Sequence, residues 1–306
     1  MTTKSTNDLY VKKEYLNFLK KKELKNKPII DKIGKLNKFY LPLSTWIYSL
    51  YKKDEKTKVI GLSGGQGAGK STVTEILKFI LKKKYGLELC VFSIDDFYKT
   101  KTQRIKMSKN IHPLFLIRGV PGTHDVSFIN KTFERLKKKN FKPVLIPKFD
   151  KGIDDRLKKS KWTKVKKPPS IIIFEGWCVG ARHQKIDVLK KSLNSIERKH
   201  DADFQWRKIV NNQLKKHYKK LFNKIDKLVY LKVPSFNYIF NWRLMQEKKL
   251  KKISKNKKSM SKLQIREFIM YYERITKQMM KDFSKISDLT IFLDKNHRSK
   301  KMEFYK

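Results

Sequence analysis

The chain has 306 residues, 39% of them hydrophobic and 12% aromatic, which is enough for a large folded core and excludes wholesale disorder. Its formal net charge is +47, and such a charge often indicates a nucleic acid or an anionic membrane as a partner. However, only 11 of the 75 basic residues are arginine, and the lysines are scattered along almost the whole chain. We therefore expect a solvated basic surface with at most non-specific nucleic-acid adhesion, and no specific nucleic-acid partner.

The N-terminal residues lack an apolar leader, and no run approaches ~18 apolar residues, so we expect no membrane association. The two cysteines, Cys90 and Cys178, lie in apolar, strand-like segments. Two cysteines make neither a disulfide framework nor a zinc site. These features predict a cytoplasmic protein in a reducing environment.

Residues 1–50 have Tyr10, Tyr15, Leu16 and Phe18 at roughly helical spacing and predict an N-terminal helical extension. In the remainder, 51–306, we expect a single domain. Short apolar runs predict buried strands at 58–62, 88–94, 143–147, 171–174, 227–233 and 289–293. Helical patterns lie between them, mainly at 71–85, 185–225 and 235–284. Strands that alternate with helices indicate an α/β fold whose sheet is mostly parallel and covered on both faces.

The segment GLSGGQGAGKST (61–72) fits the pattern G-x-x-x-x-G-K-[ST] between a predicted strand and an amphipathic helix. Glycines let backbone N–H groups approach phosphate oxygens, and the N-terminus of the helix faces the same anion. Lys70 can reach the β- and γ-phosphates, and the Ser71 hydroxyl can bind Mg²⁺. A glycine-rich turn that binds nothing is the alternative, but both flanks match the nucleotide-binding context. The predicted nucleotide-binding residues are Gly64, Gly65, Gln66, Gly67, Ala68, Gly69, Lys70, Ser71 and Thr72.

Acidic residues follow two further predicted strands. Asp95 and Asp96 come at the carboxyl end of the strand 88–94, where open α/β sheets bind ligands. A carboxylate there can orient an acceptor hydroxyl and take its proton. We expect Asp95 to be this base, with Asp96 as the alternative, although one of the pair can instead cap the next helix or bind Mg²⁺ through water.

Glu175 directly follows the apolar run 171–174. P-loop proteins place an acid there to hold the hydration shell of Mg²⁺, so Ser71 and Glu175 form the predicted metal site. Motor ATPases usually carry Asp-Glu at this position. The Glu-Gly of this chain therefore favours a kinase.

Behind the GGQGAGKST loop the chain carries, in this order, IDDFYKT, HPLFLIRGVPGTHD, PKFDKGIDDR, IIIFEGWCVGAR and YIFNWRLMQE. Together these motifs resemble the P-loop D-glycerate 3-kinase family, which has plant-type, fungal and bacterial members and is related to uridine kinase, phosphoribulokinase and pantothenate kinase. The resemblance covers roughly residues 40–295. It implies a P-loop kinase domain over 51–306 with a five-stranded sheet, ATP and Mg²⁺ as cofactors, and phosphorylation of a small hydroxy acid such as D-glycerate.

The segment IHPLFLIRGVPGTHDVSFIN (111–130) contains no lysine. Its Arg118 offers a planar fork suited to a carboxylate. By analogy with the family the segment lines the acceptor pocket, and His124 and Asp125 are further candidate contacts. A helix start is the alternative, with Thr123 or Asp125 as the N-cap and His124 a solvated neighbour. Both interpretations are compatible.

The motif PKFDKGIDDR (147–156) is rich in charge, and a solvated loop is its ordinary interpretation. The family pattern favours contacts of Asp150, Lys151 and Arg156 with the substrate or the magnesium shell. Lys148 stands where many relatives have arginine, which argues against a bidentate contact there. The predicted acceptor residues are therefore Tyr98, Arg118, His124, Asp125, Asp150, Lys151 and Arg156.

Arg243 lies in a long predicted helix ahead of the lysine-rich tract 248–260, which we expect to be a loop or a mobile helix tip. Kinases of this class often close a lid with a cation onto the transferring phosphate and exclude water. We expect a lid near 235–284 with Arg243 as its catalytic cation. The alternative is a surface arginine paired with Glu247 at i+4. Core packing is the predicted role of Trp242, Tyr271 and Tyr272.

Two other functions fit parts of the sequence. An acceptor like that of uridine kinase or pantothenate kinase keeps the enzyme class, and Arg118 separates the cases because a neutral ribose needs no cation there. A P-loop ATPase associated with nucleic acid is the alternative of a different class, motivated by the net charge. The absence of helicase-like motifs and of an arginine-rich face counts against it.

Overall fold

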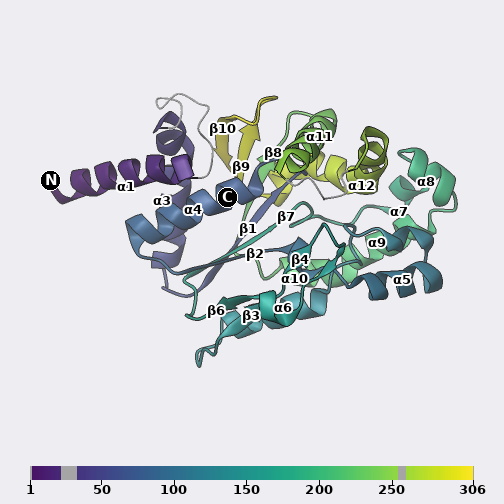
Figure 1. The fold of residues 1–306 in the computed structure, drawn as a ribbon, viewed down its shortest axis with the longest axis horizontal. Coiled ribbons are helices and arrows are strands. Elements are labelled where there is room, and N and C mark those ends of the chain that lie inside the picture. Colours follow the sequence, from purple (N-terminus) through teal and green to yellow (C-terminus); the bar gives the residue numbers. More distant parts are fainter. Residues whose placement is uncertain (1, 22–32, 254–259, 306) are drawn as a thin grey trace.

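The computed structural model describes residues 2–21, 33–253 and 260–305 (Figure 1). Its centre is a six-stranded sheet in the order β10-β9-β8-β1-β7-β2. Five neighbouring strands run parallel, and β10 pairs with β9 in the antiparallel direction. The predicted α/β fold with five parallel strands is confirmed, and an antiparallel edge strand is added to it. The strands are β1 (Lys58–Gly64), β2 (Leu89–Ser93), β7 (Ile171–Gly176), β8 (Lys227–Lys232), β9 (Leu289–Leu293) and β10 (Ser299–Phe304).

Helices cover both faces of this sheet (Figure 1). Successive side chains of a strand point to opposite faces. Accordingly, Ile171 and Ile173 of β7 belong to one hydrophobic cluster, which includes residues of α1, α3 and α4, whereas Ile172 and Phe174 belong to the other, which includes residues of α6, α9 and α12. The helices are α1 (Thr2–Lys21), α3 (Leu41–Lys52), α4 (Lys70–Tyr85), α5 (Lys101–Asn110), α6 (Val126–Leu136), α7 (Ile186–Lys190), α8 (Ser195–His200), α9 (Gln205–Gln213), α10 (Lys219–Phe222), α11 (Phe236–Ile253) and α12 (Lys262–Ile286).

The helix predicted at 71–85 is confirmed as α4. Gly69 precedes it and Gly86 follows it, and both have left-handed backbones, with φ of 85° and 65°. Glycine adopts this conformation without the steric cost of a Cβ, so it commonly ends a helix. The N–H of Gly86 donates to the carbonyl of Lys82 at 3.1 Å and closes the last turn.

The N-terminal residues that the structure describes are helical, as predicted. Phe18 of α1 stacks on Phe79 of α4 with ring centroids 5.2 Å apart, and Tyr48 of α3 stacks on Tyr85 at 4.2 Å. These helices therefore share the hydrophobic core on one face of the main sheet. Whether 1–50 forms a separate extension stays a prediction.

The apolar run 143–147 does not join the main sheet, so this part of the prediction is wrong. Only Val144–Ile146 is extended; this strand, β3, pairs antiparallel with β6 (Thr163–Val165). Pro143 and Pro147 flank it, and because proline lacks an N–H the run cannot extend into a longer ladder. A further hairpin, β4 (Phe149–Asp150) and β5 (Asp155–Arg156), follows directly.

Two helical predictions also change in detail. The stretch 185–225 is broken into α7, α8, α9, a π-helical turn at Leu214–Tyr218, and α10. The lysine-rich tract 248–260 begins inside α11, which ends at Ile253. The predicted loop or helix tip at 254–259 lies outside the described residues.

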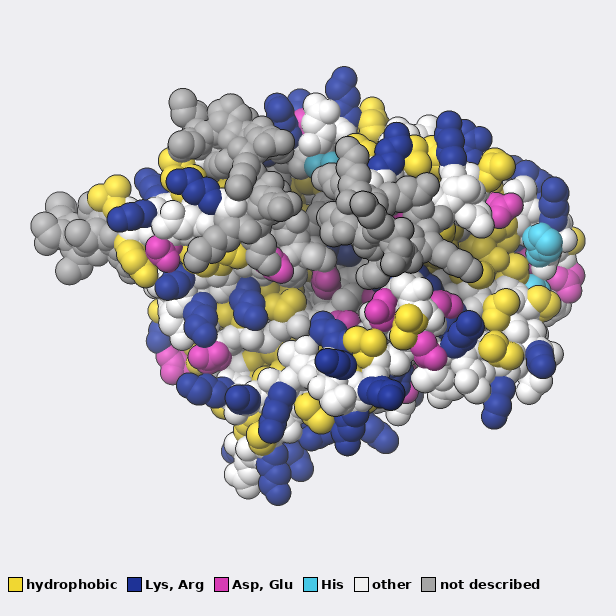
Figure 2. Space-filling model, in the orientation of Figure 1, with side chains coloured by type: hydrophobic (Ala, Val, Ile, Leu, Met, Phe, Trp, Pro, Cys, Tyr) yellow, Lys and Arg dark blue, Asp and Glu magenta, His cyan; other side chains and the backbone are white. Residues whose placement is uncertain are grey.

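Among the coloured residues in Figure 2, lysine and arginine side chains are spread over many parts of the visible face. This distribution matches a solvated basic surface. Among the helices that the structure describes, none is both long and apolar enough to span a bilayer.

Candidate active site

The loop between β1 and α4 carries the glycine-rich motif. Gly67 and Gly69 have positive φ angles of 79° and 85°, which strain any residue with a Cβ. A Cβ on Gly67 would lie 2.8 Å from Cβ of Trp242 in α11, so the loop packs tightly against this helix. The loop residues at the cavity described below are Gln66, Gly67, Gly69, Lys70, Ser71 and Thr72, whereas Gly64, Gly65 and Ala68 are buried behind them.

Lys70, Ser71 and Glu175 form one cluster at the start of α4. Lys70 Nζ donates hydrogen bonds to the carbonyl oxygens of Gly64 (2.8 Å) and Gly65 (3.2 Å), and Ser71 Oγ donates to Glu175 Oε1 (3.2 Å). Burial raises the pKa of the Glu175 carboxyl and lowers the pKa of the Lys70 ammonium. Glu175 Oε2 is buried and has no hydrogen-bond partner among the described residues. A buried, unused acceptor beside a serine hydroxyl fits the oxygen-rich environment that Mg²⁺ requires.

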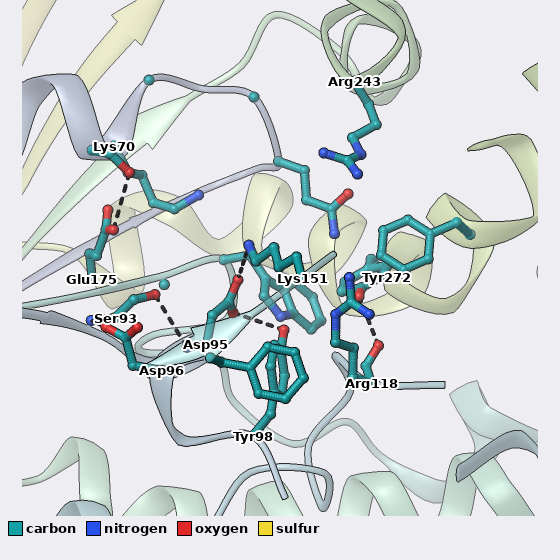
Figure 3. Close-up of a pocket in the computed structure, with 18 of the residues that line it drawn as sticks. Lys70, Ser93, Asp95, Asp96, Tyr98, Arg118, Lys151, Glu175, Arg243 and Tyr272 are labelled. Atoms are coloured by element: carbon teal, nitrogen blue, oxygen red, sulfur yellow. Dashed lines mark hydrogen bonds and ion pairs between the residues drawn. The ribbon is translucent and has the colours of Figure 1, made fainter. Parts of the chain in front are cut away.

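These groups form one wall of a cavity of about 410 Å³. It lies where β1, β2 and β7 end, at the edge of the sheet where parallel α/β folds bind ligands. Figure 3 shows side chains from the loop, the β4–β5 hairpin, α11 and α12 converging on it. Beyond the loop the lining residues are Ser93, Asp95, Asp96, Tyr98, Arg118, Lys148, Phe149, Lys151, Glu175, Gly176, Trp177, Arg243, Phe268 and Tyr272.

Asp95 faces the cavity between two polar partners (Figure 3). Tyr98 donates its hydroxyl hydrogen to Asp95 Oδ1 at 2.8 Å, and Lys151 Nζ lies 2.7 Å from Asp95 Oδ2. Burial would raise the pKa of Asp95, but the Lys151 ammonium and the hydrogen bond from Tyr98 hold it well below its usual range. Asp95 is therefore ionised and able to accept a hydrogen bond from an acceptor hydroxyl.

Asp96 is committed to local structure. Its Oδ2 accepts a hydrogen bond from the Ser93 backbone N–H at 3.1 Å, which caps the helical turn Ile94–Phe97. Lys148 Nζ lies 3.3 Å from the same oxygen, and burial raises the pKa of the carboxyl. The sequence leaves open which aspartate caps this turn. The N-cap is Ser93, whose hydroxyl accepts from the Asp95 N–H at 3.2 Å, and the Asp96 carboxylate completes this capping box while the Asp95 carboxylate faces the cavity.

Arg118 is held at the wall of the cavity. Its guanidinium donates to Asp154, and its Cζ lies 5.5 Å from the centroid of the Phe149 ring. Asp154 also binds the buried guanidinium of Arg104 at 2.8 Å. The hydroxyl of Tyr272 donates to the Arg118 carbonyl oxygen at 2.9 Å. A carboxylate, an aromatic face and a helix thus fix the position of this cation.

His124 does not line the cavity but lies behind Tyr98. The two rings stack with centroids 4.6 Å apart. His124 Nδ1 is 2.6 Å from the hydroxyl of Tyr218, which also accepts a hydrogen bond from the Gly122 N–H. Burial lowers the pKa of His124 to about 4, so the ring is neutral near pH 7. In this position it supports Tyr98, and a direct contact of His124 with the acceptor stays a prediction.

Three other predicted acceptor residues also lie outside the cavity lining. Asp125 is the N-cap of α6, where it accepts a hydrogen bond from a backbone N–H of the first turn at 3.0 Å. Asp150 accepts from the Gly152 N–H at 2.7 Å within the hairpin turn. Arg156 donates to the Tyr98 carbonyl oxygen at 2.8 Å. The N-cap alternative for Asp125 is confirmed, whereas Arg156 is not solvated as the loop alternative expects, since its side chain is 14% exposed. Direct acceptor contacts of these three residues remain predictions.

No family model matches the chain. It is 36% identical over 229 residues to a Schizosaccharomyces pombe protein named "Uncharacterized kinase mug58", with 72% of this chain and 80% of that protein covered. It is 30% identical over 237 residues to chloroplastic D-glycerate 3-kinase of Arabidopsis thaliana, with 71% of this chain covered but only 49% of the plant protein, about half its length. A solved structure of D-glycerate 3-kinase from Cryptococcus neoformans var. grubii serotype A matches with a TM-score of 0.71 and 25% identity, covering 87% of this chain and 98% of that one.

The chain belongs to the D-glycerate 3-kinase-like family of P-loop kinases. It is therefore a kinase that uses ATP and transfers phosphate to a hydroxyl group of its acceptor. The predicted family and enzyme class are confirmed.

In this kinase α11 and α12 form a wall of the cavity beside the glycine-rich loop, and α11 packs directly against that loop. Arg243 of α11 lines the cavity, pairs with Glu247 one turn later, and has its Cζ 5.8 Å from the centroid of the Phe268 ring. The predicted ion pair with Glu247 is confirmed, but the arginine lines the cavity instead of the outer surface. A catalytic role of Arg243 stays a prediction. Closure of this wall as a lid stays a prediction.

Sequence reasoning missed Tyr272 as a site residue of the kinase and assigned it to the core. The ring is 3% exposed, yet its hydroxyl reaches the acceptor side of the cavity and bonds the Arg118 carbonyl. Trp177, in the IIIFEGWCVGAR motif, packs edge-on against it at 4.7 Å. No local signal marks Tyr272, because its partner lies 154 residues away. Phe149, which also lines the cavity, lies within the motif PKFDKGIDDR, so the sequence does mark its segment as part of the site.

Proposed function

We propose that this kinase phosphorylates a hydroxyl group of a small hydroxy acid, with D-glycerate as the first candidate. One observation carries the proposal: the phosphate loop, the ionised Asp95 and the guanidinium of Arg118 open into the same cavity of about 410 Å³. A hydroxy acid needs a base for its hydroxyl and a cation for its carboxylate, and the cavity offers both. D-glycerate 3-kinases are also among the relatives of this chain.

The acceptor end favours a carboxylate over a neutral group. Arg118 and Lys151 bring two cations to the side of the cavity that carries Asp95. A guanidinium can hold a carboxylate through two parallel hydrogen bonds. A neutral ribose would bring no anion to these cations, whereas an acceptor carboxylate would add a charged partner to those that Asp154 and Asp95 supply. This is the physical reason to rank D-glycerate above uridine, the acceptor named for more distant relatives.

Transfer follows from the positions of the side chains. Asp95 accepts the proton of the acceptor hydroxyl while that oxygen forms a bond to the γ-phosphorus, the bond from phosphorus to the bridging oxygen breaks, and ADP leaves. Lys70 and Arg243 both line the cavity and can stabilise charge that develops on the phosphoryl oxygens. We infer that Ser71 and Glu175 would hold Mg²⁺, which neutralises triphosphate charge when bound.

We also infer the cellular location of the kinase. Cys90 and Cys178 are both buried free thiols, and buried unpaired cysteines support the proposed reducing, cytoplasmic location. The scattered lysines support at most non-specific contact with nucleic acid, without a role in the reaction.

The acceptor class is tested with Arg118→Met, using Arg135→Met on the exposed side of α6 as the matched control. In Arg118→Met the KM for D-glycerate should rise about 10- to 100-fold, as expected when a charged hydrogen bond is lost. The KM for ATP, and transfer to the neutral analogue glycerol, should stay close to wild type. An unchanged KM for D-glycerate would contradict a carboxylate contact at Arg118.

A further inference from the structure

The two carboxylate oxygens of Asp95 have partners of different kinds. Oδ1 accepts a hydrogen bond from the hydroxyl of Tyr98 at 2.8 Å, and Tyr98 is 2% exposed. Oδ2 lies 2.7 Å from the ammonium of Lys151, whose side chain is 58% exposed. One oxygen is therefore bound to the protein interior, and the other to an exposed side chain that lines the cavity.

The Tyr98 partner is fixed by its surroundings. Its ring stacks on buried His124, and its backbone bridges that of His124. Next to the bridge, the Lys99 N–H donates to the Thr123 carbonyl oxygen at 2.8 Å. The ring of Phe149 closes the other side at 5.1 Å. Tyr98 therefore cannot leave Oδ1 without disturbing packed structure.

The Lys151 partner is carried by the turn of the β4–β5 hairpin. The hairpin is anchored at two places: Asp154, the last residue of the turn, binds Arg104 and Arg118, and at the base the Leu157 N–H donates to the Lys148 carbonyl oxygen at 2.8 Å. The turn itself is exposed at Lys151 and the next two residues. A lysine has a flexible four-carbon stem and a single compact charge, so its ammonium can change partners while the hairpin stays in place.

We propose that Lys151 is an exchangeable partner that covers Asp95 Oδ2 until an acceptor binds, and that it then moves to the carboxylate of the acceptor. The acceptor hydroxyl takes the place of the ammonium on Oδ2, while Tyr98 holds Oδ1 and keeps the base in position. The inference rests on the proposed function, since it takes Asp95 as the base and an anionic acceptor as the substrate. It assigns Lys151 a role in acceptor specificity and in protecting ATP.

Protection of ATP follows from the same contact. Water that enters the cavity can attack the γ-phosphorus, with its oxygen bonding to phosphorus, the bond to the bridging oxygen breaking, ADP leaving and a proton passing to Asp95. An ammonium 2.7 Å from Oδ2 blocks the oxygen that would accept this proton and weakens the carboxylate as a base. Only an acceptor that offers Lys151 another anion releases the base.

The test compares Lys151→Met with Lys151→Arg, which keeps the charge, and with Lys159→Met, which removes an exposed lysine nearby. Phosphate release from Mg-ATP is measured without acceptor, with Lys70→Ala protein as the blank. We expect release to rise at least fivefold in Lys151→Met and to stay within twofold of wild type in the other two. No rise in Lys151→Met, or an equal rise in Lys159→Met, would overturn the proposal.

A second readout addresses specificity. The ratio of kcat/KM for D-glycerate to that for glycerol should fall at least tenfold in Lys151→Met and be largely restored in Lys151→Arg. Tyr98→Phe should instead lower transfer to both acceptors without raising phosphate release. An unchanged ratio in Lys151→Met, or a rise in release in Tyr98→Phe, would show that the two oxygens do not differ as proposed.

The proposed acceptor and the proposed role of Lys151 can be tested independently of each other. If wild-type protein does not phosphorylate D-glycerate, the proposed acceptor is wrong, but the release of phosphate without acceptor still reports whether Lys151 covers the base. If D-glycerate is phosphorylated but Lys151→Met changes neither phosphate release nor the ratio of kcat/KM values, the proposed acceptor is supported and the proposed role of Lys151 is wrong.

Discussion

Gly119, next to Arg118, gives a quantitative test of how the acceptor side is built. Its φ is 132°, and a Cβ added there would lie 2.0 Å from the Tyr272 hydroxyl oxygen, whereas ordinary contacts begin near 3.4 Å. In Gly119→Ala this hydroxyl must therefore retreat by about 1.4 Å, which breaks its 2.9 Å hydrogen bond to the Arg118 carbonyl. Backbone strain costs about 1 kcal/mol, and overpacking with the lost buried hydrogen bond adds about 3 kcal/mol.

Gly86→Ala is the matched control, because Gly86 also has a positive φ (65°) but nothing lies within 4 Å of its added Cβ. It should lose only the strain, about 1 kcal/mol. Urea unfolding at fixed pH measures both variants. Gly119→Ala should lose about 4 kcal/mol in total and raise the KM for D-glycerate. Equal losses in the two variants would refute the claim that Tyr272 packs against Gly119 to position Arg118.

Three further outcomes are expected. Lys70→Ala should lower transfer at least 10²-fold with an unchanged melting temperature, since it removes charge from the phosphate site without opening the core. Asp95→Asn should lower kcat by about 10²- to 10⁴-fold, and retained transfer would remove it as the base. Burial keeps His124 neutral, with a pKa of about 4 against an ordinary value of 6.5. Between pH 6.5 and pH 4 the unfolded chain therefore binds more protons than the folded chain, and the folded state loses about 3 kcal/mol of stability as the pH falls through this range. This loss should be smaller in His124→Phe, measured by urea unfolding across the window; identical pH profiles would show that His124 is not buried in the neutral form.

Features that depend on local sequence could be predicted well. The turn that holds phosphate needs glycines at adjacent positions, so the loop from Gly64 to Thr72 is visible as a motif. Asp95 and Glu175 follow apolar runs, and parallel strands bring their carboxyl ends to one edge, so their meeting also follows from pattern alone. Both Asp95 and Asp96 fit that pattern equally, and only the structure shows that Asp96 is the one that completes the capping box of Ser93.

Features that depend on distant packing could not be predicted. Tyr272 reads as a core aromatic because its hydroxyl contact lies far away in the sequence. In the sequence Asp154 is one charged residue among several, and only the folded hairpin brings it to its two partners, Arg104 and Arg118. The edge strand β10, SKKMEF, has too much charge to resemble a strand, yet Met302 packs on the core and completes the sheet.

The most direct test of the account is transfer from Mg-ATP to a small panel: D-glycerate, glycerol, uridine, pantothenate, and no acceptor. The product is read by mass as the phosphorylated acceptor, with Lys70→Ala as the control. The account predicts phosphoglycerate from D-glycerate with the active protein only, and far less product from the neutral acceptors. Phosphorylation of uridine in preference to D-glycerate, or ATP hydrolysis that rises with added RNA while no acceptor is phosphorylated, would contradict it.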